Sequence, residues 1–389
     1  MSDSSVEFAI FLIFTGAAVF ATIALYSRLA IIVGYILLGM ILGPWGLSLI
    51  SDPEQIKGIS GIGIIFLLYL LGLDLLPQQL MKMLGEAMTI TIISSILFFV
   101  VGFGIGYVFG YEMLEVVLIG ATMMFSSTII GLKLLPTTTL HHRHTGQIII
   151  SVLLIQDLIA IVVLLLLQGI DRGGNLMTDV ILQLLSLPLL LLIIYFFEKF
   201  ILEKLITRFD RIHEYIFLVA IGWCMGIAEL ASAIGLSHEI GAFLAGVALA
   251  SSPIALFITE RLKPLRDFFL VIFFFSLGAG FNMSMLEQIF IPAILLAVLV
   301  LVIKPLVFEY LLYKANEKKS ISREVGIRLG QVSEFSLLIT VLALESGYIG
   351  ETVSNMLQLT TLITFILSSY IIVLRYPTPI AISDRLRRD

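Results

Sequence analysis

The chain has few charged residues and almost no cysteine. Asp, Glu, Lys and Arg make up 13% of its 389 residues, against about 25% in soluble domains. The single cysteine, Cys224, excludes an intrachain disulfide. The sequence also lacks a Gly-rich phosphate loop and a basic tract. These absences argue against a soluble domain, a nucleotide-dependent enzyme and a nucleic-acid-binding protein, and no pattern indicates a catalytic site or a cofactor.

Long hydrophobic runs fill the sequence instead. Hydrophobic residues are 59% of the chain, and a helix crosses a bilayer with about 20 apolar residues. We predict an all-α polytopic membrane protein with 13 transmembrane helices. They are expected at residues 6–27, 29–50, 56–76, 86–110, 114–135, 145–170, 176–199, 214–236, 238–258, 267–281, 288–313, 324–346 and 353–374. The membrane domain would then cover residues 1–375, with a short basic cytoplasmic tail at 376–389.

The basic residues indicate how these helices are oriented. If the N-terminus lies outside, the outer loops hold only Lys57 and Arg172, and the other loop Lys and Arg residues all face the cytoplasm. Basic residues gather on the cytoplasmic side of membrane proteins. We therefore expect the N-terminus outside and the C-terminus in the cytoplasm, in the cell membrane of a bacterium.

The two halves of the sequence show weak internal similarity. Residues 34–42 match residues 241–249, and residues 120–126 match residues 330–336 through the pattern Gly-x4-Phe-Ser. Because the copies lie seven helices apart, the second copy would be inverted in the membrane. Inverted repeats of helices 1–6 and 8–13 are typical of secondary transporters, whose substrates bind near the midplane between discontinuous helices.

Three ionisable side chains lie near the middle of predicted helices: Asp157, Lys304 and Glu334. A charge at the bilayer centre costs about 2.5–3.5 kcal/mol on insertion scales, so such residues often mark an ion or proton path. A structural ion pair or a protonated, hydrogen-bonded Asp is the alternative for Asp157. Arg328 lies nearer a helix end, where an interfacial position is expected.

Hydroxyl side chains interrupt the predicted helix at 114–135. Ser126, Ser127 and Thr128 can hydrogen-bond backbone carbonyls and weaken the helix, and they offer oxygens to a dehydrated cation. Close helix packing through small residues is the alternative reading. The polar stretch 330–334 interrupts a later helix in the matching region. Two interrupted helices at equivalent positions predict a transport site there.

Seven stretches, taken in order, carry a resemblance to a known family. They are GYILLGMILGPWGL (34–47), ATMMFSSTIIGLKLL (121–135), GQIIISVLLIQDLIAI (146–161), GLSHEIGAFLAGVALASSP (235–253), LRDFFLVIFFFSLGAGFN (265–282), KP (304–305) and GQVSEFSLLI (330–339). The chain resembles the monovalent cation:proton antiporters of the Kef/NapA branch along their whole membrane domain. The resemblance implies an NhaA/NapA-like fold with two crossing discontinuous helices. It also implies a homodimer in which a mobile core, about 86–170 and 288–374, moves elevator-like against a dimerisation scaffold.

The resemblance also implies roles for single residues. Asp157 matches the family's carboxylate for ion and proton, Lys304 matches the core lysine, and Glu334 matches the Glu of a Gly-Glu-Phe motif whose Gly is Ser333 here. Gln156 stands where sodium-selective members carry a second Asp, and the Gln-Asp pair is similar to that of Kef potassium-efflux members. Kef members carry a cytoplasmic nucleotide-binding domain. Here that domain is either absent, a separate regulatory subunit or a part of the protein outside this sequence, so regulation by nucleotide does not follow from the resemblance.

Together these residues predict a secondary transporter that exchanges a monovalent cation for H⁺. The two ions would compete at Asp157, with Gln156 and the hydroxyls of residues 126–128 beside it and with Lys304, Ser333 and Glu334 supporting the core. A neutral Gln156 lowers the charge of the site, which favours K⁺ over the more strongly hydrated Na⁺ and favours one-for-one exchange. Lys304 either tethers the helices or pairs with Asp157.

Four other functions stay open at this point. The first is Na⁺/H⁺ antiport by the same residues. The second is a gated K⁺ channel, although the sequence contains no TVGYG-like filter. The third is a sodium-coupled carrier of an organic solute, and the fourth is a sensor that does not transport. Measuring cation flux together with proton flux separates them.

Overall fold

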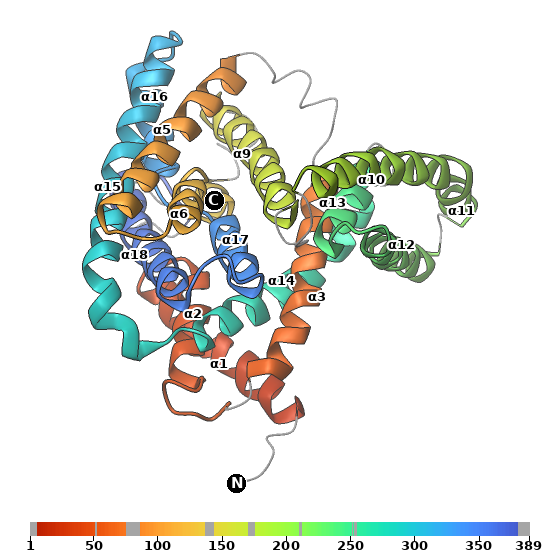
Figure 1. Ribbon diagram of the computed structural model, residues 1–389, viewed down its shortest axis with the longest axis horizontal. Coiled ribbons are helices and arrows are strands. Elements are labelled where there is room, and N and C mark those ends of the chain that lie inside the picture. The colour runs from red at the N-terminus through yellow and green to blue at the C-terminus, as the bar shows by residue number, and fades with distance from the viewer. Residues whose placement is uncertain are drawn as a thin grey trace. The chain divides into compact units, whose positions relative to one another are not determined.

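A computed structural model describes residues 6–50, 53–74, 86–136, 144–169, 176–209, 212–250, 252 and 255–379. These residues form helices, with one isolated bridge at Thr378 and no strand. Each of the 13 predicted hydrophobic stretches overlaps a helix in the described part of the chain. The helices divide into two compact units (Figure 1). The tail predicted at 376–389 is described only as far as residue 379.

The first unit contains the helices that surround the candidate site. They are α1 (Val6–Tyr26), α2 (Ile31–Leu42), α5 (Glu86–Val108), α6 (Met113–Met123), α7 (Thr128–Lys133), α9 (His144–Gly169) up to residue 163, the 3-10 turn Met283–Met285, α15 (Leu286–Lys314), α16 (Lys319–Arg328), α17 (Glu334–Glu345) and α18 (Glu351–Arg375). The long helix α15 packs against α5, α16 and α18 (Figure 1). Phe98 of α5 and Phe308 of α15 meet edge to face, with ring centroids 5.4 Å apart, and fix this contact.

The second unit is built around the crossing of α3 and α13. It contains α3 (Pro53–Asp74), α10 (Leu176–Phe197), the π-helical turn Glu198–Leu202, α11 (Glu203–Arg208), α12 (His213–Ala233), α13 (His238–Ala250) and α14 (Ala255–Ala279) up to residue 276. A Cβ atom on Gly246 of α13 would lie only 2.1 Å from the carbonyl oxygen of Tyr69 in α3. The two backbones therefore touch where a glycine leaves room.

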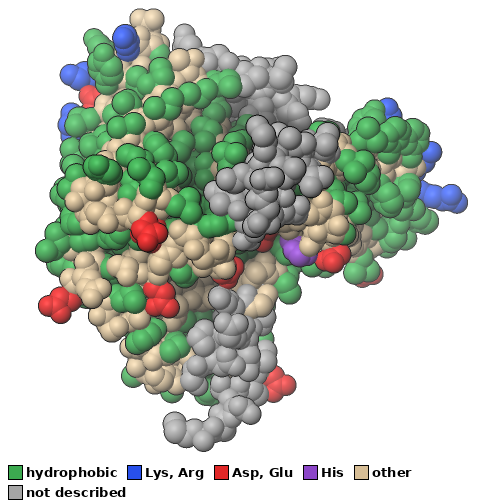
Figure 2. All heavy atoms as spheres, in the orientation of Figure 1, with side chains coloured by type: hydrophobic (Ala, Val, Ile, Leu, Met, Phe, Trp, Pro, Cys, Tyr) green, Lys and Arg blue, Asp and Glu red, His purple; other side chains and the backbone are tan. Residues whose placement is uncertain are grey.

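Hydropathy and the surface both indicate a membrane. Within the described residues, seven helices are long and apolar enough to cross a bilayer. Hydrophobic side chains cover most of the described surface in Figure 2, and Lys and Arg gather over α11 and over the junction of α15 and α16. Exposed apolar surface of this extent is expected against lipid rather than water. Interrupted and short helices fall outside this length criterion, so the number of thirteen membrane crossings stays a prediction. The inverted repeat also stays a prediction.

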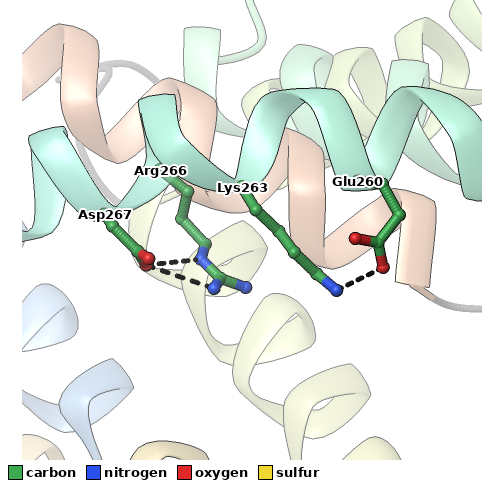
Figure 3. A network of polar contacts seen from close by, with 4 residues as sticks. All are labelled: Glu260, Lys263, Arg266 and Asp267. Carbon is green, nitrogen blue, oxygen red and sulfur yellow. Dashed lines mark hydrogen bonds and ion pairs between the residues drawn. The ribbon is translucent and has the colours of Figure 1, made fainter.

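One predicted helix, at 267–281, is much longer in the structure. α14 begins at Ala255, and its charged first half lies before the predicted start at residue 267. In Figure 3, Lys263 reaches Glu260 at 2.5 Å and Arg266 reaches Asp267 at 3.1 Å, all from α14. The Glu260–Lys263 pair, three residues apart, is of the kind that stabilises an exposed helical segment. A search for apolar residues alone misses this segment.

A second predicted helix, at 29–50, is shorter in the structure. α2 ends at Leu42, because Gly43 adopts an extended backbone conformation and Pro44 follows it. Proline lacks the N–H that would continue the helix. The remaining apolar residues to Ile50 form turns, in which the N–H of Ile50 still donates to the carbonyl of Leu42.

Candidate functional site

The helix predicted at 114–135 is broken, as its hydroxyl residues predicted. α6 ends at Met123 and α7 begins at Thr128, and the backbone between them is not helical. Ser127 is the N-cap of α7, because its Oγ accepts a hydrogen bond from the N–H of Ile130 at 3.1 Å. Such a cap satisfies one of the free N–H groups at a helix start.

The helix predicted at 324–346 is broken in the same way. α16 ends at Arg328 and α17 begins at Glu334, with Ser333 as N-cap. The two breaks lie against each other. Ser126 Oγ of the first break donates to the carbonyl of Leu329 in the second at 2.8 Å. The polar residues of both interrupted helices are thus brought together.

Lys304 of α15 joins the two breaks from one side. Its side chain is only 1% exposed, and its Nζ donates to the carbonyl of Phe125 at 2.5 Å and to that of Gln331 at 3.2 Å. It also lies 5.1 Å from the centre of the Phe98 ring, a cation–π contact. The carbonyl ends of helices carry negative partial charge, so an ammonium group is stabilised there. Among the described residues Lys304 forms no ion pair with Asp157.

Glu334 lies at the N-terminal ends of α7 and α17, whereas Lys304 lies at the C-terminal ends of α6 and α16. Glu334 is the first residue of α17, and its Oε1 accepts a hydrogen bond from the N–H of Ile129 in α7 at 3.2 Å. Helix N-termini carry positive partial charge. Lys304 and Glu334 therefore each face helix ends of the opposite sign.

Gln156 of α9 spans the first break with its side-chain amide. Its Oε1 accepts from the N–H of Ser126 at 3.0 Å, and its Nε2 donates to the carbonyl of Met124 at 3.1 Å. An Asp at this position has no N–H to donate to that carbonyl. Gln156 thus holds the shape of the break, and both of its polar atoms are used for this.

Asp157 is the next residue of α9 and has different surroundings. It is 4% exposed, yet its carboxyl group has no hydrogen bond or ion pair with any residue that the structure describes. Glu334 is the charged group within its electrostatic range. Asp157 is therefore a buried ionisable side chain beside the broken helices, and no residue in the described part of the chain compensates its charge.

Gln331 is a member of the site that had no predicted role. It is fully buried, and its Nε2 donates to the carbonyls of Ser127 and Arg328 at 3.3 and 3.0 Å. Its Oε1 accepts from Ser368 Oγ of α18 at 2.9 Å, and Thr364 of α18 accepts from the N–H of Val332. The hydroxyls of α18, spaced three and four residues apart, were the sequence signal for this contact.

Arg328 is buried within the protein instead of reaching its surface, and its place relative to the membrane interface stays a prediction. The side chain is 1% exposed. Its guanidinium donates to the carbonyl of Leu134 at 3.0 Å, to that of Pro377 at 2.9 Å, and to Glu324 at 3.0 Å. An arginine fork with five N–H donors can be buried when the ends of several helices supply acceptors.

Comparison with known proteins agrees with this architecture. The family model described as "Sodium/hydrogen exchanger, transmembrane" matches residues 10–374. K(+) efflux antiporter 5 of Arabidopsis thaliana is 29% identical over 321 residues, which are 79% of this chain and 56% of that protein. The glutathione-regulated potassium-efflux system protein KefC of Klebsiella pneumoniae is 29% identical over 336 residues, 84% of this chain and 54% of that protein. The chain thus spans about half the length of these curated relatives.

The fold is also that of a solved antiporter. The structure of the sodium proton antiporter MjNhaP1 from Methanocaldococcus jannaschii superimposes with a TM-score of 0.70 and 21% identity, covering 93% of this chain and 94% of that chain. At this identity the likeness concerns the fold alone. The family match covers nearly all of the described helices, and the resemblance to Kef-type antiporters is confirmed. The chain is a multi-pass membrane protein that belongs to the sodium/hydrogen exchanger transmembrane family.

Proposed function

We propose that this chain exchanges a monovalent cation for H⁺ across the membrane, with Asp157 as the group that both ions share. Its family and the printed names of its relatives, K(+) efflux antiporter and potassium-efflux system protein, support this activity. The observation that carries the proposal is the surroundings of Asp157. It is buried beside two broken helices and has no partner among the described residues.

The charges at the crossing support exchange by one carboxylate. Each helix end carries about half a charge, so Lys304 can balance two carbonyl ends and Glu334 can balance two N–H ends. Asp157 has no such balance. When ionised and empty it leaves one uncompensated negative charge, and H⁺ or a monovalent cation removes it. Burying an uncompensated charge in a bilayer costs about 2.5–3.5 kcal/mol or more, so the loaded form crosses more readily than the empty form.

The cation is K⁺ in this proposal. Gln156 brings no negative charge, and its amide is used by the backbone of the first break. A site with less negative charge offsets the dehydration of Na⁺ less well than that of K⁺. Na⁺ is the second candidate, because the family description names sodium/hydrogen exchange.

The same proposal includes the movement and the assembly. Alternating access is elevator-like, with a core of about 86–170 and 288–374 that moves against a dimerisation scaffold. The chain forms a homodimer in a bacterial cell membrane, with its N-terminus outside and its C-terminus in the cytoplasm.

Proteoliposomes that contain a pH-sensitive dye test this function. Gradients of K⁺, Na⁺, Rb⁺ and Li⁺ are applied in turn, with and without a clamped membrane potential. We expect the K⁺ gradient to drive the fastest proton flux, at a rate that does not change when the potential is clamped. Cation flux without proton flux would identify a channel and contradict the proposal. A faster response to Na⁺ than to K⁺ would identify a Na⁺/H⁺ antiporter.

A further inference from the structure

Two buried oxygen atoms at the start of α7 have no hydrogen-bond partner within the described part of the chain. They are Thr128 Oγ1 and Glu334 Oε2. Buried polar atoms in native proteins are nearly always paired with protein or with a bound species. Two oxygen atoms without a partner at one place therefore indicate a bound species that these protein oxygens hold.

Both oxygens belong to the same small region as Asp157. The N–H of Ile129, the residue after Thr128, donates to Glu334 Oε1 at 3.2 Å, which places the Glu334 carboxyl group at the first turn of α7. Asp157 is within electrostatic range of Glu334. Gln156, its neighbour in α9, is bonded to the backbone just before α7. Oxygens from α7, α9 and α17 are thus gathered at the crossing.

We propose that Glu334 is a direct ligand of the transported cation, through its Oε2, together with Thr128 Oγ1 and the Asp157 carboxylate. This proposal rests on the proposed function and adds a second carboxylate to its site. Alkali cations take oxygen ligands, and carboxylate and hydroxyl oxygens are suitable donors. The two oxygens of Glu334 have separate tasks. Oε1 accepts from Ile129 and fixes the group, and Oε2 is left for the ion.

Glu334 supplies a charge that Gln156 does not. The Gln156 amide is neutral and is used to hold the break. Glu334 brings a carboxylate from the other interrupted helix, next to the N-termini of α7 and α17. Asp157 remains the group that changes between H⁺ and cation. The cation is then held by two carboxylates, although only one of them exchanges a proton.

Glu334→Gln separates the ligand role from the capping role. The Gln side chain keeps an Oε1 for the N–H of Ile129 but replaces Oε2 with an NH₂ group, which cannot bind a cation. The full chain is reconstituted, and K⁺-driven proton flux is measured over a range of K⁺ concentrations and pH values. We expect the KM for K⁺ to rise about tenfold or more, the size of one charge-assisted contact. The lowest pH at which K⁺ competes with H⁺ should also rise.

Glu351→Gln is the matched control, because it removes an exposed carboxylate at the start of α18. Its KM for K⁺ should equal that of the wild type. If Glu334 only caps helices, Glu334→Gln will have a lower maximal rate and a lower Tm at an unchanged KM and pH profile, and that result overturns the proposal. Wild-type protein without any cation-driven proton flux would refute the proposed function instead, so the two failures differ.

Thr128→Val gives a second test that does not depend on the folding of Glu334→Gln. It removes the unpaired hydroxyl at nearly constant volume, and we expect the KM for K⁺ to rise, with Thr128→Ser restoring it. Thr340→Val is the control, because the Thr340 hydroxyl donates to the carbonyl of Ser336 in its own helix at 2.7 Å. A wild-type KM in Thr128→Val overturns this placement of the cation.

Discussion

Three ionisable side chains lie near the broken helices, and their partners differ. Lys304 donates to two backbone carbonyls, Glu334 accepts from a backbone N–H, and Asp157 has no protein partner among the described residues. The first two residues therefore stabilise the breaks, whereas the third is the residue that we propose binds the transported ions. In the sequence all three appear alike, as single charges in apolar runs.

The stabilising role of Lys304 predicts a large loss of stability in Lys304→Met. Met has a similar length, but it leaves the buried carbonyls of Phe125 and Gln331 without this donor, at about 1–3 kcal/mol each. We expect the free energy of unfolding to fall by at least about 2 kcal/mol. Thermal unfolding in detergent measures it, beside Lys314→Met at an exposed position. Equal stability of the two variants would contradict the role of Lys304.

The helices differ in how well local sequence indicates them. Hydrophobic runs placed a helix at each of the 13 stretches, because apolar length is a local property. The internal match was less accurate in detail, because it aligns Gly120, inside α6, with Gly330, inside the second break. Partners are not local. Gln156 contacts Met124, 32 residues away, and Arg328 contacts Leu134, 194 residues away. The periodicity of a single helix gives no information on contacts between residues so far apart in the sequence. The backbone contacts of Gln156 and Arg328 therefore could not be predicted.

The close crossing of α3 and α13 makes a prediction for these two helices. A Cβ atom on Gly246 would lie 2.1 Å from the carbonyl oxygen of Tyr69, whereas a Cβ atom on Gly226 of α12 meets nothing within 4 Å. Gly246→Ala should therefore cost about 1–3 kcal/mol through overpacking. Gly226→Ala should be neutral or stabilising by up to about 1 kcal/mol, because Ala favours helix.

Thermal unfolding of both glycine variants in the same detergent decides the matter. A Tm for Gly246→Ala at or above that of Gly226→Ala would show that the two backbones are not in contact at this crossing. A lower Tm for Gly246→Ala alone is the expected result.

At the scale of the molecule, the described helices are mostly apolar, and a small polar cluster lies at the two broken helices. The membrane class follows from composition, and the family follows from the match over residues 10–374. In the proposed exchange the polar centre holds either a proton or a cation, and in the described part of the chain the buried Asp157 carboxyl group has no hydrogen bond or ion pair. Asp157→Asn keeps the size of the side chain and removes its titration. The effect of Asp157→Asn on coupled flux therefore decides whether exchange takes place at this residue.

The most direct measurement is K⁺-driven proton flux in proteoliposomes that contain wild-type protein or Asp157→Asn, with equal amounts of folded protein confirmed by thermal unfolding. With no carboxylate to carry H⁺ or to help hold K⁺, we expect the flux of Asp157→Asn to fall to the level of protein-free vesicles, while the wild type acidifies or alkalinises the lumen according to the K⁺ gradient. Coupled flux in Asp157→Asn at the wild-type rate would contradict exchange at this residue.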